Sequence, residues 1–335
     1  PERRCEQEEK ISGLFHSRAP RLRGEWGMPA GVPFFFGGET MEEKTALITG
    51  GTSGIGLATA RFFLAQGMHV AVAGRDETHG QNALRALTRR TPSPHGVSAP
   101  RGKGGTFLAG QGRGESGEGD SGGSDEGEIR KKAGDVQGEA RYFPADVREA
   151  AACQNLVRDV AAAFGRIDVL VNAAGIYLEQ AAEKLTEEDY ARVMDTNLKG
   201  TMFMTRYALP FLRQTKGSVV NVSSDAGLHG NYLCSLYCAS KGAVTLYTRA
   251  VAREAAPFGV RVNCVCPADI LTPLTEAQLA AAPDREAALR EMASVYPLHR
   301  VGTAEEAAAV IAFLASPAAS YVTGAAWNID GGLLA

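Results

Sequence analysis

Two side chains that can exchange protons lie four residues apart in residues 235–242, where Tyr237 precedes Lys241. In a helix this spacing places both side chains on one face, about one turn apart. A cation held near a phenol favours the phenolate and lowers the tyrosine pKa from its ordinary value of about 10. The Tyr-x-x-x-Lys spacing also arises often by chance on ordinary helix faces. The pair therefore predicts proton-transfer chemistry only if the rest of the chain builds a site around it.

A glycine-rich turn near residue 50 has the composition of a phosphate-binding loop. An apolar run at residues 45–49 precedes it, and helical apolar spacing at 57–66 and a second apolar run at 69–74 follow it. This order is that of a βαβ unit. Glycines let the backbone approach a pyrophosphate closely, and the helix that follows directs its first N–H groups at the anion. The predicted phosphate-binding residues are Gly50, Thr52, Ser53, Gly54, Ile55 and Gly56.

The remainder of the chain alternates short apolar segments with helical ones. The predicted strands are residues 45–49, 69–74, 141–147, 168–175, 217–224, 260–267 and 326–330, and the predicted helices are 57–66, 76–88, 150–164, 186–197, 201–214, 235–256 and 304–315. This alternation predicts an α/β fold, a Rossmann-type doubly wound parallel sheet of about seven strands with helices on both faces. Such sheets bind ligands at the carboxyl ends of their strands. The less regular, alanine-rich residues 272–299 are predicted to form a lid over the substrate.

Composition divides the 335-residue chain into one ordered domain and two irregular segments. Residues 1–40 mix arginines with glutamates, and we expect a disordered or artefactual extension, with an organellar signal as the weaker alternative. Residues 89–138 are rich in Gly, Ser, Glu and Arg and poor in large apolar side chains. Such a segment buries too little surface to offset its ordering entropy, which predicts a disordered insertion. Residues 41–335 are otherwise predicted to form a single Rossmann-fold domain.

Several classes of partner are disfavoured by composition. The formal net charge is −3, which gives no reason to expect nucleic acid or an acidic membrane surface. No apolar run approaches the ~18 residues of a membrane span. The six cysteines show no zinc-ligand spacing with histidines, so we expect no metal and a reduced, cytoplasmic protein.

With these elements in place, the chain resembles the short-chain dehydrogenase/reductase family from about residue 44 to residue 332, apart from the insertion. The resemblance rests on five motifs in the family's order, namely Thr49-Gly-x-x-x-Gly-x-Gly, Asn172-Ala-Ala-Gly, Asn197, Ser224 and Tyr237-x-x-x-Lys241. The chain is most similar to the compact single-domain branch, which includes 3-oxoacyl-carrier-protein reductases and hydroxysteroid dehydrogenases. The resemblance implies an oxidoreductase that moves a hydride between a nicotinamide dinucleotide and a carbonyl or secondary alcohol.

The resemblance also implies a catalytic set formed by Asn197, Ser224, Tyr237 and Lys241. Ser224 would bind the substrate oxygen, and Tyr237 would exchange a proton with it. Lys241 would hold the cofactor ribose and lower the pKa of Tyr237, and Asn197 would hold a water that links Lys241 to solvent. A shift of the phenol pKa from about 10 to about 7 requires about 4 kcal/mol, so the charged nicotinamide is expected to contribute. Ser223 alternates to the opposite strand face, where we expect it to hydrogen-bond within the sheet.

The other implied cofactor contacts follow the strand ends. They are Asp146 and Val147 beside the adenine, Asn172, Ala173 and Gly175 after the fourth strand, Tyr237 and Lys241 at the ribose, and Pro267, Ile270 and Thr272 near the carboxamide.

Cofactor choice is predicted at the end of the second strand. Gly74 leaves room there and Arg75 can meet a 2′-phosphate, which favours NADP. Ser53, where NADP-preferring relatives often carry a basic residue, and Asp76, one residue beyond Arg75, keep NAD as the alternative. The family's Pro-Gly after the sixth strand is Pro267-Ala268 here, which puts the local backbone geometry in doubt.

Two questions stay open at the level of sequence. A dinucleotide-binding sensor or scaffold without turnover is the competing class of function, although it has no chemical need for all four catalytic residues. The substrate is a small carbonyl compound or alcohol, and an acyl-carrier-protein ketoreductase competes with a steroid, sugar or xenobiotic reductase. The family resemblance further implies a homotetramer or homodimer.

Overall fold

The computed structural model describes residues 41–88, 138–280 and 282–335. The predicted extension at 1–40 and the predicted insertion, except for Gly138, lie outside these described residues. In the described part of the chain, no helix combines the length and apolar character needed to cross a membrane.

Seven parallel strands form the central sheet in the order β3-β2-β1-β4-β5-β6-β9. Their bounds are β1 (Thr45–Thr49), β2 (His69–Gly74), β3 (Ala140–Pro144), β4 (Val169–Asn172), β5 (Ser218–Val222), β6 (Arg261–Pro267) and β9 (Ala326–Ile329). The predicted doubly wound sheet is therefore confirmed. The strand order reverses direction between β1 and β4, and a sheet of this kind opens a ligand crevice at that switch point.

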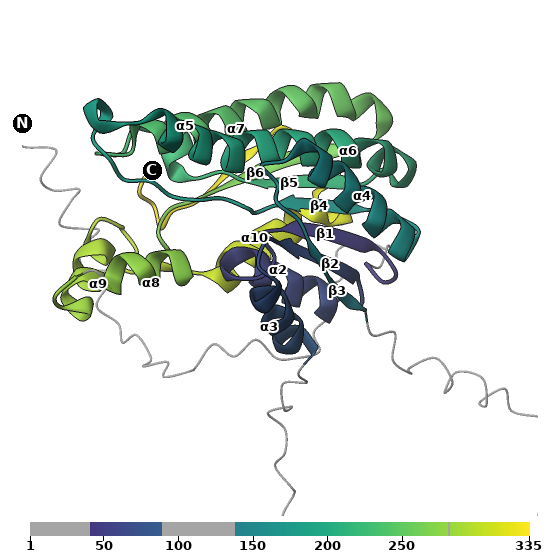
Figure 1. Cartoon of the computed structure of the whole chain (residues 1–335), viewed down its shortest axis with the longest axis horizontal. Helices are drawn as coiled ribbons and strands as arrows, with labels where there is room; N and C mark the ends of the chain where they lie inside the picture. Colours follow the sequence, from purple (N-terminus) through teal and green to yellow (C-terminus); the bar gives the residue numbers. More distant parts are fainter. Residues whose placement is uncertain (1–40, 89–137, 281) are drawn as a thin grey trace, which may run out of the picture. The chain divides into compact units, whose positions relative to one another are not determined.

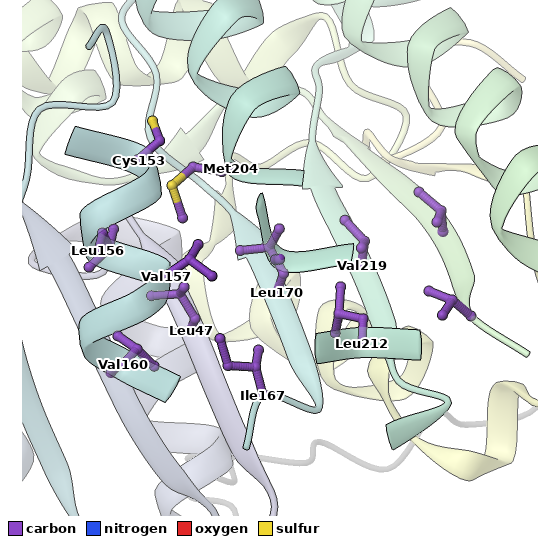
Figure 2. Packing of buried hydrophobic residues seen from close by; sticks show 14 of the residues in the cluster. Leu47, Cys153, Leu156, Val157, Val160, Ile167, Leu170, Met204, Leu212 and Val219 are labelled. Atoms are coloured by element: carbon purple, nitrogen blue, oxygen red, sulfur yellow. The ribbon is translucent and has the colours of Figure 1, made fainter. Parts of the chain in front are cut away.

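Helices cover both faces of the sheet (Figure 1). One face carries α4 (Ala150–Phe164), α6 (Gly200–Thr215) and α7 (Ser235–Ala255), and the other carries α2 (Gly54–Ala65), α3 (Glu77–Thr88) and α10 (Ala304–Ala315). Strand β1 shows why two cores form, because Leu47 packs on the first face while Ala46 and Ile48 pack on the second. Figure 2 shows the first core, in which Leu47 lies beside Val157 and Val160 of α4, and Met204 and Leu212 of α6 belong to the same cluster.

The sheet ladder ends earlier than the apolar runs suggested. The strands predicted to reach residues 147, 175 and 224 end at Pro144, Asn172 and Val222. After β3, the Asp146 carboxylate accepts the Arg148 backbone N–H at 3.0 Å and turns the chain out of the sheet. The residues released from the ladder at these ends are the ones that the motifs single out.

A single helical stretch replaces the two helices predicted at 186–197 and 201–214. Helix α5 (Glu187–Met194) continues through a π-helical turn, η3 (Asp195–Lys199), directly into α6. Gly200, which lies between the two predicted helices, serves close packing, since a Cβ there would lie 2.8 Å from Val147 Cγ2. The glycine therefore lets α6 approach the turn that follows β3.

The predicted irregular region at 272–299 is more ordered than expected. It contains α8 (Pro273–Ala280) and α9 (Arg285–Ser294), and the short strands β7 (Ile270–Leu271) and β8 (Gly302–Thr303) flank it. The Asp284 side chain caps α9 by accepting the Ala287 N–H at 3.0 Å. An ion pair between Arg285 and Glu276, with N and O 2.6 Å apart, joins the two helices.

Candidate active site

The glycine turn after β1 lies at the switch point of the sheet. Gly50 and Gly54 have φ of +64° and +50°, a backbone region that favours glycine. A Cβ on Gly50 would lie 2.7 Å from the Ala173 carbonyl oxygen, and one on Gly56 would lie 2.3 Å from the Gly50 carbonyl oxygen. The turn is thus packed directly against the end of β4.

The start of helix α2 has the electrostatics of an anion site. Its first turn contains no acidic residue, and the Ser53 side chain makes no capping hydrogen bond to it. The backbone N–H groups and the positive end of the helix dipole therefore face the turn without a competing carboxylate. These features fit the pyrophosphate of a dinucleotide, held by the backbone of residues 50–56.

The close packing of Gly56 gives a direct test of this turn. We expect Gly56→Ala to destabilise the fold by about 1–3 kcal/mol, because the new methyl group overlaps a backbone carbonyl. We expect the dinucleotide dissociation constant, measured by fluorescence titration, to rise about tenfold or more as the turn opens. The control is Gly165→Ala at the end of α4, where φ is +76° and nothing lies within 4 Å of the new Cβ. That variant should lose stability without losing affinity, and equal affinity of both variants would contradict the assignment of the turn.

Tyr237 and Lys241 lie on the same face of α7, as their spacing predicted. The Lys241 Nζ atom is 5.8 Å from the centroid of the Tyr237 ring and donates a hydrogen bond to the Val222 carbonyl oxygen at 2.8 Å. Lys241 is only 5% exposed, whereas Tyr237 is half-buried. Ser224 follows β5 and lies close enough to Tyr237 to influence the pKa of its hydroxyl. The structure therefore brings these three predicted catalytic residues together.

The prediction for Ser223 holds for its backbone but not for its side chain. The Ser223 N–H donates to the Val265 carbonyl oxygen of β6 at 2.9 Å. Its Oγ instead donates to the Lys241 carbonyl oxygen at 2.9 Å and lies 2.7 Å from Thr245 Oγ1, so the side chain binds helix α7. Strand β5 ends at Val222, which frees Ser223 to face the helix. The two adjacent serines divide their roles, since Ser223 holds α7 in place while Ser224 faces Tyr237.

Asn197 reaches this group from the π-helical turn η3. Its Oδ1 accepts the Ile176 N–H at 2.8 Å, and its Nδ2 donates to the Ile176 carbonyl oxygen at 3.0 Å and to Ser240 Oγ at 3.0 Å. A Cβ on Gly175 would lie 3.3 Å from Lys241 Nζ and 3.4 Å from Asn197 Oδ1. Asn197 thus lies close to Lys241 and anchors the loop after β4. Its predicted water-holding role stays a prediction.

Burial dominates the titration of the central pair. It raises the pKa of Tyr237 to about 12, with hydrogen bonding to Ser224 opposing the rise and the charge of Asp225 adding to it. Burial also lowers the pKa of Lys241 to about 8. The predicted lowering of the Tyr237 pKa by Lys241 stays a prediction, because burial is the largest influence on that phenol. We expected that Lys241 alone would not bring the pKa of Tyr237 close to neutral, and the raised pKa of Tyr237 agrees with this expectation.

The side of the site that would receive the adenosine is formed by residues at the ends of β2 and β3. Hydrogen bonds from Arg148 are the main cause that lowers the pKa of Asp146. The charge of the exposed Arg75 adds a smaller lowering. The Asp146 carboxylate is 2.6 Å from the Arg148 guanidinium. Val147, predicted to touch the adenine, is 9% exposed and packs against Gly200, which leaves little of its side chain for a ligand.

The remaining predicted contacts lie at the ends of β4 and β6. Asn172 is 3% exposed, and its Nδ2 donates to Thr205 Oγ1 and to Asn221 Oδ1, so its side chain faces the core. Thr272 lies beside the glycine turn, with its Cγ2 3.3 Å from the Cβ position of Gly54.

The end of β6 also joins this group. The Pro267 carbonyl oxygen is 3.4 Å from Ser224 Oγ, and Ile270 is 5% exposed. Ala268 is not among the residues with left-handed backbone, so the alanine in place of the family's glycine causes no strain there.

Sequence inspection missed two polar groups around the site. Asn172 and Asn221 occupy paired positions of β4 and β5, and Asn221 Nδ2 continues to Thr248 Oγ1 at 2.8 Å, which forms a buried polar connection between α6 and α7. The aligned asparagines at two strand ends were the available signal. The second group is Asp225 with His229, whose four-residue spacing directly after Ser224 was not recognised.

The fold and this arrangement define an NAD(P)-dependent oxidoreductase with a Rossmann-type fold, and comparisons with known proteins agree. Residues 44–99 match the family model described as short chain dehydrogenase, and residues 120–334 match that described as Enoyl-(Acyl carrier protein) reductase. The chain belongs to the short-chain dehydrogenase/reductase family, whose members act on alcohol and carbonyl groups.

Individual relatives cover most of the chain. It is 39% identical over 295 residues to a 3-oxoacyl-(acyl-carrier-protein) reductase of Thermotoga maritima, covering 88% of this chain and 99% of that protein. It is 33% identical over 290 residues to an L-fucose dehydrogenase of Bos taurus, covering 86% and 88% of the two chains. Among solved structures, the aldohexose dehydrogenase of Thermoplasma acidophilum matches with a TM-score of 0.66 at 26% identity, covering 88% of this chain and 94% of that one.

Proposed function

We propose that the protein interconverts a carbonyl compound and its secondary alcohol with NADP(H), using Tyr237 as the general acid and base. The observation that carries this proposal is the convergence of the half-buried Tyr237 with Ser224 and Lys241 at the strand ends. A bound nicotinamide supplies the hydride acceptor in oxidation and the hydride donor in reduction.

Each residue has a distinct task in this proposal. The Tyr237 hydroxyl gives its proton to the carbonyl oxygen as that oxygen gains negative charge, and takes it back in the oxidative direction. Ser224 Oγ holds the same oxygen in place. Lys241 holds the cofactor ribose. Its ammonium and the positive charge of the oxidised nicotinamide together favour the Tyr237 phenolate. Asn197 fixes the loop after β4 through Ile176 and so keeps Gly175 against Lys241.

Turnover of a substrate panel tests the proposal. The purified full chain would be assayed by nicotinamide absorbance with aldehydes, ketones and alcohols, in both directions and with both dinucleotides. By their names, relatives act on sugars and on acyl-carrier-protein thioesters, so both kinds of substrate belong in the panel. We expect turnover of at least one class. Dinucleotide binding without any turnover would instead favour a sensor or scaffold.

NADP is the cofactor that the end of β2 favours. A Cβ on Gly74 would lie 3.0 Å from Thr52 Cγ2, so no carboxylate stands at the position where NAD enzymes hold the ribose 2′-hydroxyl. Arg75 next to it is exposed and free to approach a phosphate. The Asp76 carboxylate accepts the His79 N–H at 2.8 Å and so caps α3. This bond lowers the pKa of Asp76 and keeps the carboxylate ionised, so its charge remains the argument for the NAD alternative.

Removing the Arg75 guanidinium should change cofactor preference. We expect Arg75→Ala to raise the KM for NADPH about tenfold, the effect of losing one charge-assisted contact of about 1.5–3 kcal/mol. The KM for NADH should change much less, because NADH has no 2′-phosphate for Arg75 to meet. Steady-state kinetics with both cofactors measures the two values, and exposed Arg158→Ala on α4 provides the matched control. A wild-type preference for NADH that Arg75→Ala leaves intact would support the NAD alternative.

The oligomeric state stays a prediction. Met202 on α6 and Leu246 on α7 are 40% and 67% exposed, which supports association of copies through these helices. Sedimentation equilibrium would distinguish a monomer from the expected dimer or tetramer.

A further inference from the structure

A polar cluster of Asp225, His229 and Asn231 lies directly beside Ser224. The Asp225 Oδ1 atom accepts the Ser224 hydroxyl at 2.7 Å. The Asp225 Oδ2 atom lies 3.1 Å from His229 Nε2 and accepts Asn231 Nδ2 at 3.4 Å. One carboxylate therefore links the predicted substrate-holding serine to an imidazole and an amide.

The local backbone fixes this cluster in position. Residues 225–227 form a single helical turn, and the Ser224 Oγ caps it by accepting the Ala226 N–H at 3.2 Å. The His229 N–H then binds the Asp225 carbonyl oxygen at 3.1 Å, which places the two side chains one turn apart on the same side. The cluster is thus positioned by the same turn that presents Ser224.

The hydrogen-bonding side chains of the cluster differ in how far they are exposed. The side chain of Asp225 is 11% exposed and that of His229 is 33% exposed. Because Nε2 of His229 is engaged by Asp225, Nδ1 is the ring nitrogen left for a further hydrogen-bond partner. The imidazole and the Asn231 amide can each accept or donate, depending on tautomer and orientation. Hydroxyl groups are the substrate groups that such partners satisfy.

A second carboxylate lies near the other side of Ser224. The Pro267 carbonyl oxygen is 3.4 Å from Ser224 Oγ, and two residues later Asp269 accepts the Tyr296 hydroxyl at 2.6 Å. Burial raises the pKa of Asp269, and the negative charge of Asp225 adds to the rise. A substrate that carries its own negative charge meets like charges here. These polar groups already have partners within the protein, but an aliphatic substrate would remove water from them without adding a hydrogen bond, at a cost in free energy.

We propose that Asp225, His229 and Asn231 bind a hydroxyl group next to the reacting carbon, so that the substrate is a neutral polyhydroxylated compound, a sugar or polyol. The inference rests on the proposed oxidoreductase function and selects one of the substrate classes left open by the sequence. A lipophilic ketone and an acyl thioester both lack the second hydroxyl that the cluster would hold.

Matched substrates test this inference in the full-length protein. myo-Inositol and cyclohexanol are both six-membered ring alcohols, and aldohexoses, linear polyols and an acetoacetyl thioester complete the panel. With the preferred dinucleotide, we expect kcat/KM for the best polyhydroxylated substrate to exceed that for cyclohexanol by about 100-fold or more, because a site built for a hydroxyl discriminates against its absence. A wild-type preference for cyclohexanol or the thioester would overturn the inference and leave the proposed function standing.

Variants then assign the preference to the cluster. We expect His229→Leu and Asp225→Asn to reduce the ratio of polyol to cyclohexanol kcat/KM about tenfold or more, mainly through KM for the polyol. The control is Asp159→Asn, which removes an exposed carboxylate of α4 and should leave the ratio unchanged. A purely structural role would lower both kcat/KM values equally and keep the ratio, which would refute the inference. Thermal unfolding of each variant checks folding, and a panel without any turnover would instead defeat the proposed function and this inference with it.

Discussion

Tyr237→Phe should lower kcat by about 10³-fold, within the range expected when a general acid and base is removed. The substitution deletes one hydroxyl and keeps the ring, which packs edge-on against Tyr177 with centroids 5.1 Å apart and planes at 72°. Ser224 and Lys241 remain in place, and so do the glycine turn and the start of α2. Dinucleotide affinity should therefore be retained while turnover is lost. Nicotinamide absorbance measures the loss in kcat, and fluorescence titration measures dinucleotide binding.

Tyr177→Phe is the matched control, because it removes a hydroxyl from the neighbouring ring. The Tyr177 hydroxyl lies 3.2 Å from Cys234 Sγ and 3.2 Å from Glu179 Oε2, so it is occupied by partners outside the proposed proton path. Burial also raises the pKa of Tyr177, which keeps that phenol protonated. We expect the control to lose less than about tenfold in kcat, the scale of a perturbed neutral hydrogen bond. If the two variants had equal activity, Tyr237 would have no role as acid and base.

Lys241→Met should abolish most activity and change how stability depends on pH. Loss of the ammonium leaves Tyr237 in surroundings that already raise its pKa to about 12, and we expect kcat/KM to fall by about 10²–10⁴-fold. The stability effect follows from the pKa of Lys241 itself, which burial lowers from 10.5 to about 8. The folded protein therefore binds fewer protons than the unfolded chain between about pH 8 and pH 10.5.

The sign of that effect is fixed by proton linkage. Stability rises with pH wherever the unfolded state binds more protons, so wild-type protein gains stability from about pH 8 to pH 10.5 and carries the full cost of the buried ammonium below pH 8. That cost is about 3 kcal/mol. Urea unfolding at pH 7.5 and 9.5 should show wild type gaining about 2 kcal/mol relative to Lys241→Met. The lost bond to the Val222 carbonyl cancels in this comparison, and parallel pH profiles would exclude a buried, charged Lys241.

The fold was predictable because the apolar residues of each strand show which of its faces are buried. Runs such as residues 69–74 are apolar on both faces, which is the mark of a parallel strand covered on two sides. The catalytic grouping was predictable for a different reason, since four residue types at family spacing imply one geometry. What escaped prediction was where the regular strands stop, because this depends on single side chains and not on apolar patterning. Asp146 turns the chain after β3 by accepting the N–H of nearby Arg148, and Ser223 directs its hydroxyl to helix α7 while its N–H still bonds to β6.

The electrostatics of the site escaped prediction on physical grounds. The spacing of Tyr237 and Lys241 shows that they are neighbours, but it contains no information about their desolvation. In the structure, burial sets both pKa values and opposes the simple attraction of a cation for a phenolate. The charge of the Asp225 carboxylate adds to the rise in the pKa of Tyr237. Asp225 begins a one-turn helix after Ser224 that no sequence motif predicted.

The π-helical turn at residues 195–199 has a consequence for the candidate active site. A π turn holds one residue more than the α turn it replaces. Deleting a single residue from it would rotate α5 by about 100° relative to α6, in keeping with 3.6 residues per turn. The Asn197 amide would then leave the Ile176 backbone, although the sequence would still contain the motif. The length of the chain at this point therefore matters to the site as much as the identity of Asn197 does.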